Sequence, residues 1–152
     1  YGLTVKLRKA TAADLSFARE LTRVNMREYY AEYARVWQGQ SFDDEWEARQ
    51  SFIINKADKP VGFLSFSMEP HYLYLRDVQL CEPYRGEGIG GWVMGQIASM
   101  ACELGARSVR LKVFKSNPAM QLYRRQGYEV VGQEKALFWM ERILESSAVC
   151  RE

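Results

Sequence analysis

A glycine-rich segment near the middle of the chain constrains the fold more than any other feature of the sequence. Residues 85–91 are Arg-Gly-Glu-Gly-Ile-Gly-Gly, between a β-rich run at 72–80 and a stretch at 93–104 whose apolar residues recur at helical spacing. Closely spaced glycines let the main chain wrap around an anion, because no Cβ stands in the way. The unpaired N–H groups and the dipole at the start of a helix favour negative charge there. The segment is therefore either a phosphate-binding loop or a tight strand-to-helix turn without a ligand.

Two common nucleotide-binding motifs do not account for this segment. Three of its glycines have the spacing of the dinucleotide fingerprint, but that motif has an acidic residue about 20 positions further on, where residues 110–112 are Arg-Leu-Lys. A P-loop ends in Gly-Lys followed by Ser or Thr, whereas this segment ends in Gly-Gly and is followed by Trp92. Both nucleotide interpretations therefore fail on their context.

Hydrophobic periodicity predicts an α+β chain. Strands are expected at residues 3–7, 51–57, 61–68, 72–80, 109–113, 128–133 and 136–142. Helices are expected at 10–24, 25–37, 93–104 and 117–125, with a further short one that begins at 41–44. The pattern also predicts a break near Asn25, a helix end at Gly39 and a cap at Gly105. Because the helices interrupt a mixed sheet instead of alternating strictly with parallel strands, the fold class is α+β.

The composition is that of one globular domain. At roughly 150 residues per domain, the 152 residues make a single domain spanning 1–152. Hydrophobic residues are 47% and charged residues 26% of the chain, which excludes a disordered or coiled-coil protein. A net charge of +2 is too small for a dedicated nucleic-acid binder, and alternate basic residues between 107 and 115 are more typical of a solvated strand face. No segment approaches the roughly 18 apolar residues of a membrane span.

Cysteine and histidine usage bears on compartment and on metals. Cys81, Cys102 and Cys150 are an odd number without C-x-x-C spacing. This argues against a disulfide framework and for a reducing compartment, so we expect a cytoplasmic protein. A zinc site would need all three together with His71, the only histidine, and their spacing matches no structural zinc pattern. We therefore expect no metal site.

The glycine segment and its surroundings resemble one known family. Arg85-x-x-Gly88-x-Gly90 is the acyl-coenzyme-A signature of the GCN5-related N-acetyltransferases, and the order of elements agrees. Further matching segments are Val78-x-Leu80, Asn117-Pro118-Ala119, Leu122-Tyr123 and Gly127-Tyr128. The resemblance covers about residues 53–142, and 74–90 look particularly like diamine acetyltransferases. It implies a mixed, mostly antiparallel central sheet of about six or seven strands flanked by about four helices.

The resemblance also implies a coenzyme site. The N–H groups of the loop would hold the pyrophosphate of acetyl-CoA, and main-chain groups of the preceding strand would bind its pantetheine arm. The residues implied are Val78, Leu80, Arg85, Gly86, Gly88, Ile89, Gly90 and Asn117. Asn117 is independently expected to cap the helix that follows it. Glu87 departs from the pattern, because a carboxylate inside an anion loop is unfavourable unless it points to solvent.

The activity implied is direct transfer of an acetyl group, within a ternary complex, from acetyl-CoA to a primary amine of a small molecule. The partner would then be a small-molecule amine, with neither nucleic acid nor membrane involved, and the protein would be a monomer or a homodimer. A non-catalytic acyl-CoA sensor and a protein or peptide N-acetyltransferase are the alternatives.

Two residues are implied for the chemistry. Tyr123 falls where these enzymes keep a tyrosine beside the coenzyme sulfur, and a phenol of pKa about 10 can donate a proton to a departing thiolate. The glutamate that precedes the strand aspartate in diamine acetyltransferases is replaced here by Arg76. Asp77 is then the candidate base, unless Arg76 ties up its carboxylate. Glu69 and Glu134 are the reserve candidates.

Residues 28–47 would border the acceptor in this fold, and their charge is one-sided. The acidic residues, which oppose a single Arg35, are Glu28, Glu32, Asp43, Asp44, Glu45 and Glu47. The interleaved aromatic residues, which are the candidates for contacting the acceptor, are Tyr29, Tyr30, Tyr33 and Trp37. Carboxylates and aromatic faces both attract cations. The segment is therefore either a pocket for an amine with a second positive charge or an aromatic-compatible body, or a solvated acidic helix face.

Overall fold

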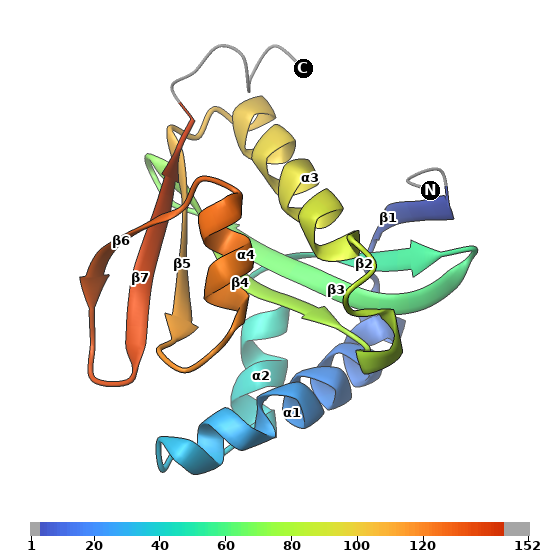
Figure 1. Ribbon diagram of the computed structural model, residues 1–152. Helices are drawn as coiled ribbons and strands as arrows, with labels where there is room; N and C mark the ends of the chain where they lie inside the picture. Colours follow the sequence, from blue (N-terminus) through green and yellow to red (C-terminus); the bar gives the residue numbers. More distant parts are fainter. Residues whose placement is uncertain (1–3, 145–152) are drawn as a thin grey trace. The chain divides into compact units, whose positions relative to one another are not determined.

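The computed structural model describes residues 4–144 and has an α+β fold, as expected (Figure 1). The strands are β1 (Val5–Lys9), β2 (Gln50–Lys56), β3 (Lys59–Met68), β4 (Tyr72–Leu80), β5 (Ser108–Phe114), β6 (Glu129–Gln133) and β7 (Leu137–Ile143). The helices are α1 (Leu15–Glu32), α2 (Gly39–Trp46), α3 (Ile89–Glu103) and α4 (Ala119–Arg125), with short 3₁₀ turns at Ala12–Asp14 and Glu82–Tyr84. The 7-stranded sheet has the order β1-β2-β3-β4-β5-β7-β6 and is mostly antiparallel, with β4 and β5 parallel.

The described residues divide into two compact units. Residues 4–66 with 77–87 form the first unit, and residues 67–76 with 88–144 form the second. The first unit contains α1 and α2, and the second contains α3 and α4. Within residues 4–144, no helix is both long and apolar enough to cross a membrane.

Helix α1 of the first unit is continuous. It follows a capping box formed by Thr11 and Asp14, which satisfies N–H groups at the helix start. The break expected near Asn25 is wrong, because α1 runs to Glu32 without interruption. Ala18 and Thr22 are buried, and Asn25 continues the same helix face at a spacing of about three to four residues. Packing along this face therefore extends the helix through the predicted break.

The core of the first unit joins α1 and α2 to β2 and β3. Phe42, Ile53 and Phe63 are buried in this core, and Trp37 packs against it. The alternation of β2 and β3 directs one set of side chains toward these helices. Gly39 begins α2 instead of ending the helix before it, so that prediction is also wrong.

A tight hairpin connects β2 to β3. Ala57 and Asp58 have φ values of 51° and 68°, so this two-residue turn lies one residue earlier than expected, and Pro60 is part of β3. Gly62 then permits a close approach of main chains. A Cβ at this position would lie 2.3 Å from the carbonyl oxygen of Gln79 on β4, which leaves room only for glycine.

The second unit contains the parallel pair of strands. Residues 72–75 of β4 pair with residues 108–111 of β5. On its other side β5 pairs with β7, and β7 pairs with β6, both in antiparallel direction. Helix α3 contributes the apolar stripe expected from its spacing. Its buried residues are Ile89, Val93, Met94, Ile97, Ala98 and Ala101. Gly105, with a φ of 81°, follows the end of α3 as predicted.

The cysteines depart from the expectation at one position. Cys102, near the end of α3, is disulfide-bonded, whereas Cys81 is a half-buried free thiol. Cys150 lies outside the described residues. The expectation that the cysteines are not disulfide-bonded is therefore wrong at Cys102.

Candidate active site

The glycine segment forms a tight turn that leads directly into α3. Gly86 and Gly88 have φ values of 77° and 85°, in the left-handed region that favours glycine. Gly88 directly precedes α3, and the N–H of Trp92 donates to its carbonyl oxygen (3.1 Å). The N–H groups of residues 89–91 therefore have no acceptor within the helix. The Ile89 side chain is buried and anchors the turn. This is the backbone arrangement of an anion site.

The carboxylate of Glu87 does not leave a net negative charge in this turn. It forms an ion pair with the Lys56 ammonium on β2, whose Nζ donates a hydrogen bond to Oε1 at 2.7 Å. The same ammonium lies 5.7 Å from the ring centroid of Tyr84. The sequence identified Glu87 as unfavourable for anion binding, and Lys56 offsets that charge.

Arg85 fastens the turn to α1. Its Nη2 donates to Oδ1 of Asn25 (2.6 Å) and to the Leu80 carbonyl oxygen (3.3 Å). The Asn25 amide in turn donates to the Leu80 carbonyl (3.0 Å) and to Oε1 of Gln79 (3.1 Å). The carbonyl of Leu80 is thus already used within the fold, so a pantetheine contact at this residue would have to use its N–H. Val78, the other predicted strand residue, is half-buried on β4.

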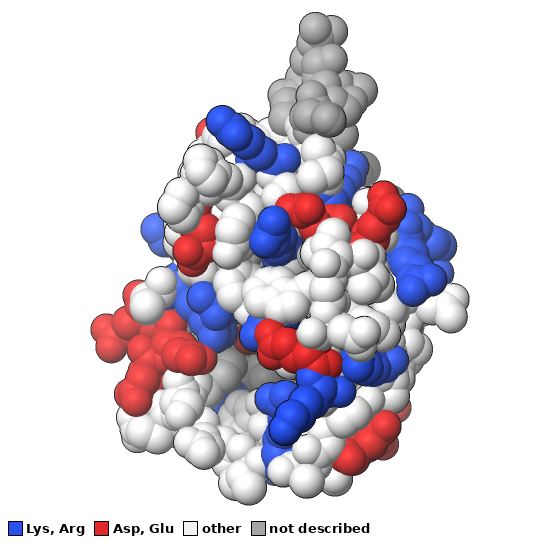
Figure 2. Space-filling model, turned by 90° about the vertical axis from the view of Figure 1, so that its left-hand side faces the viewer, with Lys and Arg blue, Asp and Glu red and all other residues white. Residues whose placement is uncertain are grey.

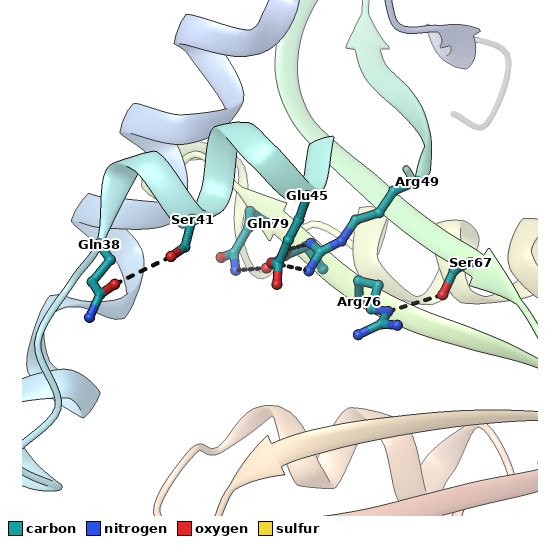
Figure 3. A network of polar contacts seen from close by, with 8 residues as sticks. Gln38, Ser41, Glu45, Arg49, Ser67, Arg76 and Gln79 are labelled. Carbon is teal, nitrogen blue, oxygen red and sulfur yellow. Dashed lines mark hydrogen bonds and ion pairs between the residues drawn. The ribbon is translucent and has the colours of Figure 1, made fainter. Parts of the chain in front are cut away.

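Asp77 lies in the first unit and is held by two side chains. Nη1 of Arg49 lies 3.1 Å from its Oδ2, and Nε2 of Gln79 donates to its Oδ1 (3.2 Å). Arg49 also binds Oε1 of Glu45 (2.7 Å), so that its guanidinium bridges two carboxylates (Figure 3). Burial raises the pKa of Asp77 above its ordinary value, although Arg49 and the Gln79 hydrogen bond oppose the rise. A raised pKa suits a carboxylate that has to accept a proton.

Arg76 is not the partner of Asp77, so the alternative in which it ties up this carboxylate is wrong. Its Nε donates to the Ser67 hydroxyl (3.0 Å), as Figure 3 shows, and its guanidinium carbon lies 3.8 Å from the ring centroid of Tyr74. Neighbouring residues of a strand point to opposite faces, which separates the side chains of Arg76 and Asp77.

Tyr123, the candidate acid, lies in the second unit on α4. Its half-buried ring packs against Tyr128, with centroids 6.0 Å apart and ring planes at 56°. The Tyr128 ring is almost fully buried, its hydroxyl has no hydrogen-bond partner among the described residues, and burial raises its pKa. Tyr123 rather than Tyr128 therefore presents the more accessible hydroxyl of the two.

The remaining predicted coenzyme residues of the second unit shape the ends of α3 and α4. Oδ1 of Asn117 accepts from the N–H of Ala119 (2.9 Å), so this asparagine caps α4 as expected. Gly90 faces α4, since a Cβ there would come within 3.1 Å of Cδ2 of Leu122. Both residues keep the start of their helix compact.

Glu69 and Glu134 are the reserve candidates for the base, and Glu134, like the basic residues of β5, is paired with other side chains. Glu134 accepts from Nε1 of Trp139 (2.8 Å) and pairs with Lys112 (3.2 Å). Glu69 lies in the turn before β4, where its N–H donates to the Tyr72 carbonyl. Arg110 pairs with Glu141 at 2.8 Å. Figure 2 likewise shows basic and acidic side chains close together over the face that it presents.

The predicted acceptor residues separate into two groups. Tyr30 and Trp37 line a hollow of about 310 Å³ in the first unit, which we call the arginine hollow. Its lining residues are Arg23, Met26, Arg27, Tyr30, Ala31, Arg35 and Trp37. Tyr29 and Tyr33 are not among them. Burial and the nearby Asp77 carboxylate raise the pKa of Tyr30.

The structure bears on the two alternatives for the acidic residues of 28–47. Among the described residues, the lining of the arginine hollow contains three arginines and no acidic residue, so an acidic pocket is not found there. Two of the acidic residues pair with arginines outside the segment: Asp43 with Arg19 (2.8 Å), and Glu45 with Arg49 (2.7 Å). A count of charges along the segment does not give the charge of the hollow, because it ignores the direction of each side chain.

Sequence reasoning missed the residues that hold the candidate site together. Arg49 contacts Asp77 across 28 positions of the chain, Lys56 contacts Glu87 across 31, and Asn25 contacts Gln79 across 54. No local motif marks such pairs. The surplus of carboxylates in residues 28–47 was the one available signal that an arginine outside the segment was needed.

Comparison with known proteins identifies the family of the chain. The profile of the acetyltransferase (GNAT) family matches residues 18–128. Streptothricin acetyltransferase of Streptomyces lavendulae is 36% identical over 93 residues, or 59% of this chain and 49% of that protein. Thialysine N-epsilon-acetyltransferase of Bos taurus is 38% identical over 56 residues, or 36% of this chain and 33% of that protein. The chain thus spans half or less of the length of these relatives.

Solved structures share the fold at low sequence identity. PaiA N-acetyltransferase from Thermoplasma acidophilum, in complex with coenzyme A, has a TM-score of 0.74 and 16% identity, covering 91% of this chain and 98% of that chain. Spermidine N-acetyltransferase from Vibrio cholerae, in complex with CoA and spermine, has a TM-score of 0.73 and 17% identity, covering 93% and 96%. Since the family profile also matches more than half of the residues, this chain belongs to the acetyltransferase (GNAT) family.

Proposed function

We propose that the protein is an acetyl-CoA-dependent N-acetyltransferase whose acceptor is a primary amine of a small molecule. The observation that carries this proposal is the turn at residues 85–91, where N–H groups without helical acceptors lie at the start of α3 and Lys56 neutralises Glu87. Such a helix start favours a bound phosphate group. Family membership supports acetyl-CoA as the donor.

In this proposal the turn holds the coenzyme pyrophosphate through main-chain N–H groups. Arg85 acts by fastening the turn to Asn25 and the Leu80 carbonyl, as its hydrogen bonds indicate. The main chain of β4 near Val78 binds the pantetheine arm. Asn117 contributes by capping α4, next to the position of the candidate acid.

The acceptor must first lose a proton. An alkylammonium of pKa about 10.4 is neutral about once in 2,500 molecules at pH 7, which corresponds to a cost of about 4.6 kcal/mol. Asp77, whose pKa is raised by burial, accepts this proton. The neutral nitrogen then forms a bond to the thioester carbonyl carbon, and the C–S bond breaks. Tyr123 donates a proton to the departing sulfur. The nitrogen, which becomes positively charged when the new bond forms, then loses its second proton to the tyrosinate or to water, which leaves a neutral amide and a neutral thiol.

The relatives support a small acceptor. The names of streptothricin acetyltransferase and thialysine N-epsilon-acetyltransferase both specify small amine-bearing molecules. The size of the arginine hollow, about 310 Å³, is at the lower end of the range for small-molecule pockets.

Two measurements test the proposal. Coenzyme A, but not NAD or ATP, should raise the thermal midpoint, since a ligand that binds only the native state stabilises it. Arg85→Ala and Gly88→Val should abolish this shift, whereas Arg107→Ala, which removes an exposed arginine of the second unit, should retain it. Thiol release from acetyl-CoA across a panel of amines, peptides and antibiotics then identifies the acceptor class. A coenzyme shift without thiol release would indicate a sensor, and release with peptides alone would indicate a peptide acetyltransferase.

A further inference from the structure

The arginine hollow has a composition that favours an anion. Three arginines, Arg23, Arg27 and Arg35, are among the residues that line a volume of about 310 Å³, and within residues 4–144 no acidic residue belongs to this lining. Like charges brought together repel one another, and an anion placed among them relieves that repulsion. Guanidinium forks also match the geometry of carboxylate and phosphate oxygens.

Part of this positive charge is available for a ligand. Arg23 is bound by Glu20, one turn away on α1, where both oxygens of the carboxylate accept its hydrogen bonds. Arg27 makes no hydrogen bond or ion pair within residues 4–144 and is exposed on the same helix face. Arg27 is thus an exposed arginine that lines the hollow, within electrostatic range of Glu20 and with guanidinium donors that a ligand can use.

The remaining walls are apolar and firmly packed. The rings of Tyr30 and Trp37 meet edge to face, with centroids 5.9 Å apart. Trp37 packs in turn against the buried Phe42, also at 5.9 Å, and Met26 completes the apolar lining. A ligand with an aromatic or apolar body beside its charged group would therefore fit better than a small ion alone.

The helix that carries most of the hollow's lining is connected to the candidate base by hydrogen bonds. Asn25 of α1 donates to Gln79 (3.1 Å), and Gln79 donates to Asp77 (3.2 Å), all within the first unit. An acceptor whose amine reaches Asp77 could thus place a second group among the arginines.

We propose that the arginine hollow binds the acid group, a carboxylate or a phosphonate-type group, of an acceptor amine with an aromatic or apolar body. This inference rests on the proposed function and specifies its substrate class. It differs from the cationic acceptor that was one of the two alternatives for residues 28–47.

The test compares acceptors that differ only in the acid group. Phenylalanine, its phosphonate analogue 1-amino-2-phenylethylphosphonate, and phenethylamine share one aromatic body, and kcat/KM is measured for each by thiol release. A hydrogen-bonded ion contact is worth about 1.5–3 kcal/mol, so at least one of the acids should exceed phenethylamine by about 10-fold or more. The stronger of the two acids identifies the preferred group.

Variants assign the preference to the hollow. Arg27→Gln and Arg35→Gln should each reduce the ratio of acid to phenethylamine by about 10-fold. Arg107→Gln removes one exposed positive charge from the second unit and should leave the ratio unchanged. Equal kcat/KM for all three amines, or a ratio that none of the hollow variants alters, overturns the inference while leaving the proposed function intact.

A second measurement keeps the two proposals distinguishable. If no amine releases thiol, 3-phenylpropionate, which has the acid group but no amine, is titrated into the protein and the thermal midpoint is followed. A rise in the wild type that is lost in Arg27→Gln supports the hollow as an acid site even though the proposed function has failed. No rise in the wild type overturns the inference about the hollow, and the proposed function is decided separately by the coenzyme A shift and the full panel of acceptors.

Discussion

Replacing Arg49 by methionine should destabilise the protein chiefly by leaving the Asp77 carboxylate without a cationic partner. The guanidinium lies 3.1 Å from Asp77, and the side chains of the two residues are 14% and 16% exposed. Methionine keeps much of the apolar stem of arginine but not its charge. Arg49 also contacts Glu45, but that carboxylate is 58% exposed and its contact contributes little.

The magnitude follows from the burial of the pair. Removing one partner of a buried ion pair costs about 3–5 kcal/mol, and the slight exposure of both groups here favours the lower value, about 3 kcal/mol at neutral pH. Replacing Asp77 by asparagine should cost less, because Arg49 keeps Glu45 as a partner. The double variant should therefore be more stable than the sum of the two single losses predicts.

The loss should depend on pH in a defined direction. Burial raises the pKa of Asp77, so protonation favours the folded state, and stability from this group is lost as pH rises from about 3.9 through the folded pKa. Arg49 lowers this pKa, and its removal shifts the pKa further upward. The difference between wild type and Arg49→Met should consequently be small in acid and grow toward neutral pH.

Urea unfolding at several pH values between 4.5 and 8 measures these differences. Arg23→Met is the matched control, because its pair with Glu20 is solvent-exposed and its loss should not be measurable. A loss for Arg49→Met that does not change with pH, or that is fully additive with Asp77→Asn, would refute the assignment of the penalty to the buried carboxylate.

Three further predictions concern the hairpin, the glycine turn and the candidate acid. Gly62→Ala should lower stability by about 1–3 kcal/mol in urea unfolding, because its Cβ would lie 2.3 Å from a β4 carbonyl oxygen, whereas Gly95→Ala, in open space on α3, should be neutral or stabilising. Lys56→Met should weaken coenzyme A binding in calorimetry by several-fold and Glu87→Gln should not, because only the first leaves a negative charge in the turn; equal weakening by both would contradict this. Tyr123→Phe should lower kcat by about 10- to 1,000-fold with little change in coenzyme affinity, and unchanged turnover would remove this tyrosine from the mechanism.

Local sequence was sufficient for most of the secondary structure and for the glycine turn. β4 occupies the predicted residues 72–80, and α3 ends before Gly105 as its spacing and cap indicate. Asn117 caps α4 as predicted. These features depend on side-chain periodicity, glycine conformations and hydrogen bonds between residues a few positions apart. The interactions that decide them are therefore visible within a short window of sequence.

Only the tertiary structure decided the charge environment of the candidate site. Arg49 rather than Arg76 holds Asp77, and the hollow beside Tyr30 and Trp37 is lined by arginines, which the charges of residues 28–47 did not predict. Tertiary packing also decided the length of α1, which runs through Asn25 although the local sequence pattern predicted a break there. Electrostatic partners are set by distance and by the direction of side chains in space. A linear sequence records neither for residues that are 28 or 60 positions apart, as in the Arg49–Asp77 and Asn25–Arg85 pairs.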